Sequence, residues 1–201
     1  AESDDSNLAV LVSADQLTMT PALNYNGSVN ITVTVSDGFL ANTSSFALAI
    51  NAVNDAPTIV LPESFTFAED GSLTRDFTDY IDDIDEDALF LTASGNADIT
   101  VAIDGLTVTF GSILTFNGTE DIAFTVDDSQ GRAVATDTIA VIVTPVNDAP
   151  VLAAIADTLT TAEEELLFLT LYAKDVDGDD LEFNAESASP DEVEVVVYGN
   201  Q

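Results

Sequence analysis

The sequence predicts an all-β protein made of tandem Greek-key β-sandwich repeats of about 92 residues each. Three observations support this fold class. Apolar and polar residues alternate over short runs rich in Val, Ile, Thr and Phe, as in half-buried strands. Gly, Asn and Asp separate these runs, and no helical stripe is longer than about two turns. Several short motifs also return at a nearly constant spacing, which is typical of repeat proteins.

The repeat is visible in three pairs of motifs. Val53–Pro57 (VNDAP) recurs unchanged as Val146–Pro150, 93 residues later, and Asn117-Gly118-Thr119 follows Asn26-Gly27-Ser28 by 91. The acidic segment at 83–87 matches 175–179 after 92 residues. The spacing predicts the C-terminal half of a repeat at 1–52, a linker at 53–57, a complete repeat at 58–145, a second linker at 146–150, and the N-terminal half of the next repeat at 151–201. Because both ends fall within a repeat, we expect the chain to be a piece of a longer protein.

About seven strands in roughly 90 residues are typical of a Greek-key sandwich. Within the complete repeat, alternation predicts strands at Ser64–Phe67, Phe90–Ala93, Ile99–Ile103, Leu106–Phe110, Ile122–Val126 and Thr138–Val143. Turns are predicted between them at Asp70-Gly71, Asp104-Gly105, Asn117-Gly118 and Gln130-Gly131. In the last half repeat, Phe168–Tyr172 is interpreted as a buried strand. We expect neither half repeat to be stable alone, because neither can bury a complete sheet face.

Composition excludes several classes of function. The chain has 37 acidic and 3 basic residues, giving a formal net charge of −34. Nucleic acids and anionic membranes need a Lys/Arg surface, and only Arg75, Arg132 and Lys174 are present. With no His and no Cys there is no imidazole base, no thiolate and no zinc site of the usual kind. No apolar run is long enough to cross a bilayer. Hard, oxygen-preferring cations remain as candidate metals.

Two acidic turns are candidate sites for such a cation. Asp83, Asp85 and Asp87 recur as Asp175, Asp177 and Asp179. Carboxylates about 4 Å apart repel by roughly 4 kcal/mol at an effective dielectric near 20 unless a cation lies between them. The alternative is that each turn is a solvated loop of an acidic, salt-adapted protein. The recurrence of the acidic turn at the same place in the repeat disfavours this alternative. A helical calcium loop is disfavoured too, because its obligatory sixth-position Gly is Asp180 here.

These motifs resemble the cadherin-like tandem repeats, of the VNDAP type, found in large bacterial surface adhesins, including RTX-type adhesins. The resemblance rests on Val-Asn-Asp-Ala-Pro at the boundary, the acidic pair Glu69-Asp70, the Asp-x-Asp turn, and the later Asn-Gly and Val-Ser-Asp-Gly motifs. It implies a cadherin- or immunoglobulin-like sandwich with Ca²⁺ bound where successive repeats meet. The implied ligands at the first joint are Asn54, Asp55, Asp83, Asp85 and Asp128. Those at the second are Glu69, Asp70, Asn147, Asp148, Asp175 and Asp177, with Asp87 and Asp179 as additional candidates.

The resemblance also implies a function. Calcium would stiffen the joints into a rod that carries a binding domain away from the cell surface and supports adhesion, in a secreted or surface-located bacterial protein. Its partners would be calcium, the neighbouring repeats and a cell-surface or glycan ligand. The two half repeats could also complete each other between two copies of the chain, and Asp37 would then join Asp175 and Asp177.

Two other classes of function are less consistent with the sequence. A calcium-stabilised carbohydrate-binding sandwich of a secreted polysaccharide-degrading system usually exposes Trp or Tyr for stacking on sugars. This chain has no Trp, and Tyr25 and Tyr80 are expected in the core or at its rim. Catalysis by paired carboxylates, as in glycoside hydrolysis, is disfavoured because the acidic turns recur at every joint, and we therefore expect no enzyme.

Overall fold

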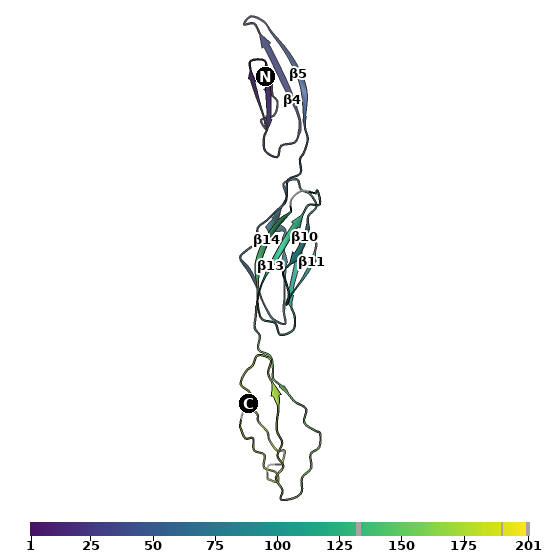
Figure 1. The fold of residues 1–201 in the computed structure, drawn as a ribbon, viewed down its shortest axis with the longest axis vertical. Helices are drawn as coiled ribbons and strands as arrows, with labels where there is room; N and C mark the ends of the chain where they lie inside the picture. The colour runs from purple at the N-terminus through teal and green to yellow at the C-terminus, as the bar shows by residue number, and fades with distance from the viewer. Residues whose placement is uncertain (132–133, 190, 200–201) are drawn as a thin grey trace.

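The computed structural model describes residues 1–131, 134–189 and 191–199. They form three bodies in a row, which we call the N-terminal unit (1–52), the central unit (58–145) and the C-terminal segment (151–199) (Figure 1). The single-chain linkers at 53–57 and 146–150 join them. Among the described residues, one 3₁₀ turn, η1 (Thr78–Tyr80), is the only helix, and no helix is long and apolar enough to span a membrane. The all-β prediction is confirmed.

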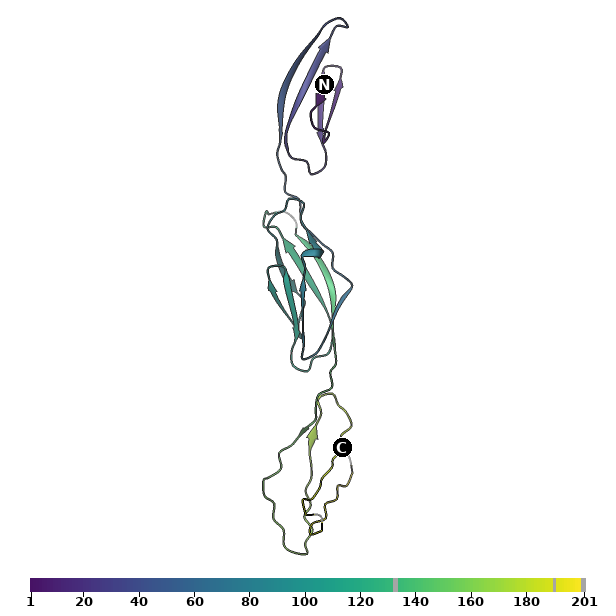
Figure 2. The same cartoon turned by 180° about the vertical axis from the view of Figure 1, so that it is seen from behind.

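The central unit is a sandwich of two main sheets. One contains β10 (Phe90–Ser94), β13 (Gly118–Asp127), β14 (Ala135–Thr144) and β7 (Ser64–Ala68), in that order. The other contains β11 (Ile99–Asp104), β12 (Thr107–Ser112) and β8 (Ser72–Asp76). The short strands β6 (Thr58–Ile59) and β9 (Ile81–Asp82) pair at the end that faces the N-terminal unit (Figure 2). All pairs are antiparallel except β7 with β14.

The core of the central unit lies between these sheets. Alternate residues of β13 and β14 point inward, and Phe124, Val126, Ile139 and Val141 are fully buried. Phe77 packs on Phe124 with ring centroids 4.8 Å apart, in a tilted geometry that aromatic pairs favour. All six strands predicted for this unit are confirmed. Tyr80 lies at the rim of the core, as expected.

The N-terminal unit contains two small sheets. One is β1 (Glu2–Ser3), β4 (Gly27–Ser36) and β5 (Ala41–Ile50), and the other is β2 (Leu8–Ser13) with β3 (Gln16–Pro21). Its buried core consists of Leu8, Val29 and Ile31, with Tyr25 packed at the edge as expected. The Tyr25 hydroxyl donates a 2.6 Å hydrogen bond to Asp5, which lowers the pKa of that carboxyl.

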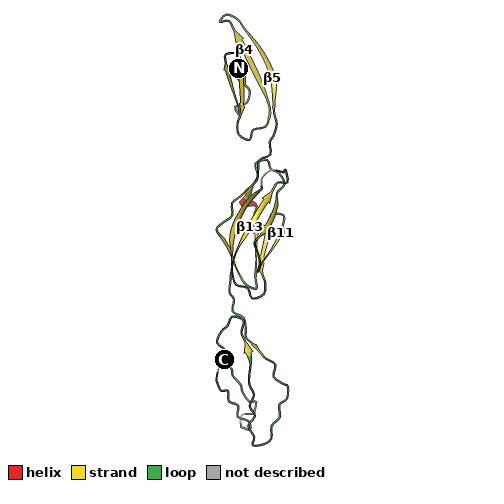
Figure 3. Cartoon of the chain, in the orientation of Figure 1, coloured by secondary structure: helices red, strands yellow, loops and turns green. Residues whose placement is uncertain are grey.

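The C-terminal segment has little regular structure (Figure 3). Its strands are β15 (Val151–Leu152) and β16 (Ala173–Lys174), and none of its described residues is buried. The prediction of a buried strand at Phe168–Tyr172 is wrong, since these residues lie outside any strand and the Phe168 side chain is 81% exposed. The stretch corresponds to residues 76–80 of the central unit, because the Ala153 N–H donates to the Tyr172 carbonyl as the Val60 N–H donates to the Tyr80 carbonyl, both at 2.8 Å. In the central unit that stretch is the end of β8 followed by η1, so it is not a buried strand there either.

Candidate metal sites at the two joints

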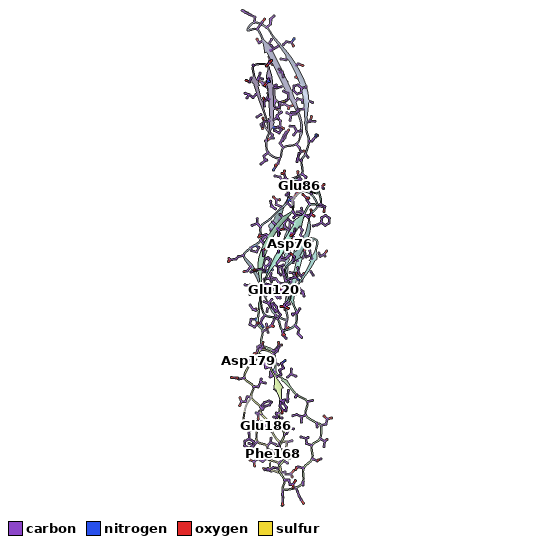
Figure 4. The ribbon with its side chains drawn as sticks, viewed as in Figure 1. Asp76, Glu86, Glu120, Phe168, Asp179 and Glu186 are labelled. Carbon is purple, nitrogen blue, oxygen red and sulfur yellow. The ribbon has the colours of Figure 1, made fainter. Side chains whose placement is uncertain are left out.

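The first acidic turn (Asp83, Asp85, Asp87) follows β9. Hydrogen bonds from its own backbone N–H groups to the Asp83 side chain hold its shape. Oδ1 of Asp83 accepts hydrogen bonds from the N–H groups of Asp85 (2.9 Å) and Asp87 (3.3 Å). Glu86 adopts a left-handed φ of 59°, which turns the chain between them. One oxygen from each of the three aspartates lies within 4.8 Å of the others. Figure 4 labels Glu86 at the end of the central unit that faces the first joint.

Two hydrogen bonds attach the first linker to the central unit, one to this turn and one to Asp128, which follows β13. The Asp55 N–H donates to Oδ2 of Asp85 at 2.7 Å, and the Asn54 side-chain amide donates to Oδ2 of Asp128 at 2.8 Å. Asp128 is only 2% exposed. The Asn54 amide, together with the Gln130 backbone N–H, lowers the pKa of this carboxyl and keeps it ionised. Of the five residues that the resemblance implies for the first joint, the structure pairs Asn54 with Asp128 and the backbone of Asp55 with Asp85, and places Asp83 beside Asp85.

Two buried side-chain oxygens at the first joint have unsatisfied hydrogen-bonding capacity. Oδ1 of Asn54 and Oδ2 of Asp83 are buried, yet neither accepts a hydrogen bond from any residue in the described part of the chain. Leaving a buried acceptor unsatisfied costs about 1–3 kcal/mol. Both atoms are hard oxygen donors, the class that calcium and magnesium prefer. The residues present therefore fit a divalent cation, and their role as its ligands stays a prediction.

The second acidic turn (Asp175, Asp177, Asp179) repeats this geometry. Oδ1 of Asp175 accepts from the N–H groups of Asp177 (2.9 Å) and Asp179 (3.4 Å), and one oxygen of each aspartate lies within 4.8 Å of the others. The Asp148 N–H donates to Oδ2 of Asp177 at 2.6 Å, as Asp55 does to Asp85. Figure 4 shows Asp179 at the end of the C-terminal segment that faces the second joint. The aspartates here are more exposed than those at the first joint.

The base of the central unit contributes a buried acid to the second joint. Glu69 follows β7 and is only 3% exposed. Its Oε1 accepts from the Val146 N–H at 2.8 Å and from the Asn117 side-chain amide at 3.4 Å. Asp70, the next residue, takes a left-handed φ of 62° in the turn that follows β7. A carboxylate of the central unit is thus hydrogen-bonded to the second linker.

Acids from both sides of the second joint act on Asp148. The pKa of Asp148 is raised, first by burial and then by the negative charges of Asp70, Asp177, Glu69 and Asp175. These four residues come from the central unit and from the C-terminal segment. In the absence of a cation, the joint therefore concentrates like charges contributed from both sides.

Two predicted residues behave differently from the rest. The Asn147 side-chain amide donates to the neighbouring Asp148 carbonyl at 3.0 Å. Asp37 lies in the turn between β4 and β5, where the N–H groups of Leu40 and Phe39 lower the pKa of its carboxyl. Its proposed proximity to Asp175 and Asp177 requires a second copy of the chain.

Two contributors were not assigned to a site from the sequence. Asn117 contacts Glu69, and the Gln130 amide donates to Asp87 at 3.3 Å. The only sequence signal for Asn117 was its place in the recurring Asn-Gly motif, and Gln130 gave none.

A family comparison finds a match within the central unit. Residues 54–144 match the family model described as a bacterial Ig domain. The match supports an Ig-like repeat here. The match begins at Asn54 and ends at Thr144, so its bounds nearly coincide with the repeat read from the sequence. The finer, cadherin-like type is not distinguished by this match.

Other comparisons add little. No curated protein matches the chain significantly. Among solved structures, the endo-fucoidan hydrolase MfFcnA4 from glycoside hydrolase family 107 is similar at 20% identity, with a TM-score of 0.35 and 73% of this chain covered. MfFcnA9 of the same family is similar at 13% identity, with a TM-score of 0.34 and 69% of this chain covered. The chain spans about a quarter of those proteins, 23% and 26% of their respective lengths. No functional conclusion follows at this level of similarity.

Proposed function

We propose that this chain is part of a bacterial cell-surface or secreted adhesin of the cadherin-like type, in which calcium bound at the joints holds successive Ig-like repeats in a stiff rod. The observation that carries the proposal is the pair of unsatisfied buried oxygens on Asn54 and Asp83, at a joint where the linker is hydrogen-bonded to the carboxylates of Asp85 and Asp128. Bacterial Ig-like domains commonly occur in surface or extracellular proteins, which supports the location.

The residues of each joint would have distinct tasks. Asp83, Asp85 and Asp128 at the first joint, and Asp175 and Asp177 at the second, would supply charged oxygens. Asn54 would supply its side-chain oxygen while its amide keeps Asp128 in place. The turn N–H groups hold the aspartates in position before any ligand arrives, which lowers the ordering cost of binding. A bound divalent cation would supply the positive charge that offsets carboxylate repulsion.

Rigidity then follows from where the ligands come from. At the second joint, Glu69 and Asp70 belong to the central unit, Asp148 to the linker, and Asp175 and Asp177 to the C-terminal segment. Ligands from the central unit, the linker and the C-terminal segment would fix the angle between the two bodies once they share one site. Without that shared site, repulsion among the same acids favours bending. We propose no catalytic role, because the acids of both turns are accounted for by this arrangement.

Small-angle X-ray scattering tests the proposal on the full chain. The radius of gyration and maximum dimension should rise and become sharply defined with calcium, and fall and broaden with a chelator. Asp175→Asn should reduce the calcium response, whereas Asp121→Asn, which removes an equal charge from an exposed position on β13, should leave it unchanged. Identical scattering with calcium and with chelator would refute the stiffening mechanism.

A further inference from the structure

Asp128 is a buried acid whose two oxygens are both engaged within the first joint. The residue follows β13 and is 2% exposed. Its Oδ2 accepts a hydrogen bond from the Asn54 side-chain amide, and its Oδ1 accepts one from the Gln130 backbone N–H, both at 2.8 Å. The bond from Gln130 closes a local turn in the loop after β13. Asp128 is therefore held in place by its own loop, independently of the linker.

The negative charge of Asp128 determines which way the Asn54 amide faces. An ionised carboxylate only accepts hydrogen bonds, whereas a side-chain amide has a nitrogen that donates and an oxygen that accepts. The nitrogen of Asn54 must therefore face Asp128, and its oxygen must face away. A neutral amide at position 128 can pair with either end of Asn54, so it would not impose this orientation.

The orientation that Asp128 selects has a consequence for the Asn54 oxygen. Oδ1 of Asn54 is buried, and no residue in the described part of the chain donates a hydrogen bond to it. Oδ2 of Asp83 is buried and unsatisfied in the same way. The opposite orientation would place N–H donors where the Asn54 oxygen now lies, and calcium binds oxygen rather than N–H groups. Asp128 thus selects the orientation in which Asn54 can act as a ligand.

Asp128 is the fixed member of this pair. It follows a ten-residue strand that lies between β10 and β14, whereas Asn54 belongs to a linker outside any strand. A second hydrogen bond between the first linker and the central unit runs from the Asp55 N–H to Asp85 and involves the linker backbone. That bond places the linker on the repeat, and the orientation of the Asn54 side chain is set by Asp128.

Anchoring of the linker does not by itself explain a charged residue at position 128. Burying a carboxylate costs more than burying a neutral amide or hydroxyl. A neutral acceptor at this position would also bind the Asn54 amide and hold the linker. The charge is explained when the orientation of Asn54, and not only its attachment, is required.

We propose that Asp128 is a positioning residue for the first joint, which orients Asn54 so that its side-chain oxygen is presented to a divalent cation. This inference rests on the proposed calcium function. It assigns Asp128 a task in addition to the charge that it would supply to the site. Much of the effect of Asp128 on calcium affinity should therefore depend on the presence of Asn54.

A double-mutant cycle on calcium affinity tests this dependence. Isothermal titration calorimetry is carried out on the full chain with Asp175→Asn and Asp177→Asn, so that the heat reports the first joint. In this background, Asp128→Asn should weaken calcium binding by about tenfold, the order expected for loss of a hydrogen bond to a charged group. When Asn54→Ala is also present, Asp128→Asn should weaken binding by less than about threefold, because coupled residues do not contribute additively.

Two variants serve as matched controls. Asp83→Asn removes the charge of a proposed ligand, so it should weaken calcium binding both with and without Asn54. Asp121→Asn removes an equal charge from an exposed position on β13 and should leave the affinity unchanged. Thermal melts in chelator show whether each variant is folded.

NMR of the Asn54 side chain separates positioning from anchoring and can be measured on the natural chain. In chelator, one amide proton should be shifted downfield and protected from exchange by the hydrogen bond to Asp128. On addition of calcium, the side-chain carbonyl carbon of Asn54 should shift because its oxygen becomes a ligand. An anchoring role alone would leave that signal unchanged. In Asp128→Asn the calcium-dependent shift should be lost.

The outcomes distinguish this inference from the proposed function. A natural chain that binds no calcium overturns the proposed function and this inference with it. Calcium binding in which the losses from Asn54→Ala and Asp128→Asn are additive overturns the inference alone. If Asp128→Asn does not fold, the NMR of the natural chain decides, and an Asn54 carbonyl signal that does not respond to bound calcium overturns the inference. Coupled losses and a calcium-dependent Asn54 signal support both proposals.

Discussion

Replacing Asp83 by Asn should stabilise the chain in chelator but make it less stable than the natural chain in calcium. Asn keeps an Oδ1 that can accept from the Asp85 and Asp87 N–H groups, so the turn should survive. It removes one of the three charges whose oxygens lie within 4.8 Å of one another. The substitution therefore isolates charge from local structure.

The magnitude follows from Coulomb's law. Two unit charges 4.8 Å apart repel by about 0.9 kcal/mol in water and about 3.5 kcal/mol at an effective dielectric of 20. Removing Asp83 eliminates two of the three pairs in the turn. Because salt screens the turn and its side chains can move apart, we expect a gain of about 1–2 kcal/mol in chelator, equivalent to roughly 5–10 °C in Tm.

Calcium should invert this ranking. A ligand present at 100 times its Kd stabilises the folded state by about 2.7 kcal/mol, or roughly 10–20 °C for a unit of this size. Asp83→Asn loses a charged ligand and should forfeit most of that gain. Differential scanning calorimetry of the full chain, with calcium, magnesium or chelator, measures both terms, and Asp121→Asn is the charge-matched control at the other end of the unit.

Two results would refute the reasoning. If Asp83→Asn is less stable than the natural chain in chelator, the carboxylate contributes to the apo fold and the repulsion argument fails. If both proteins gain equally from calcium, Asp83 is not a ligand. An equal gain from sodium chloride alone would favour a salt-adapted acidic protein instead.

Three further predictions concern the fold. Phe77→Ala should destabilise the central unit by about 3–5 kcal/mol in urea denaturation, because the ring is fully buried against Phe65 and Phe124. Phe168→Ala should change that transition by less than about 0.5 kcal/mol, because its side chain is exposed, and a larger effect in dilute monomer would contradict the described C-terminal segment. Glu120→Gln should cost about 1–3 kcal/mol at pH 7, because the Glu120 carboxylate accepts from the backbone N–H groups of residues 97–99. Burial opposes ionisation of Glu120, yet those N–H groups outweigh it and lower its pKa, so the difference between the two proteins should shrink as pH falls below about 4.5, its ordinary value, and a constant difference would argue against this.

The fold was largely predictable because the features that determine its strands and turns lie within short stretches of sequence. Alternation along Ile122–Val126 and Thr138–Val143 matches the buried faces of β13 and β14, and the turn residues lie where the chain reverses. Phe168–Tyr172 shows the limit of this reasoning. Its residues have the apolar character of a strand, but their counterparts at 76–80 in the central unit form the end of β8 and η1. A short apolar run does not by itself distinguish a strand from such a turn.

The candidate sites were predictable only in part. The spacing of Asp83, Asp85 and Asp87 fixes the turn, because Asx turns form within a few residues. The contacts of Asn117 and Gln130 depend on loops 43–48 residues away in sequence, so no pattern could reveal them. The unsatisfied oxygens of Asn54 and Asp83 are likewise visible only once the linker is docked on the repeat.

The second linker shows how one short motif can orient two repeats. The N–H groups of Val146 and Asp148 donate to carboxylates of different bodies, Glu69 of the central unit and Asp177 of the C-terminal segment. Residues two apart in an extended chain direct their N–H groups to the same side, about 7 Å apart. The two carboxylates therefore lie along one side of the linker, and burial of Asp148 beside them explains why its pKa rises. Because the spacing of these donors is set by backbone geometry, the joint can form only with a linker of this length. Inserting one residue after Val146 should therefore abolish the calcium response while leaving the core of the central unit intact.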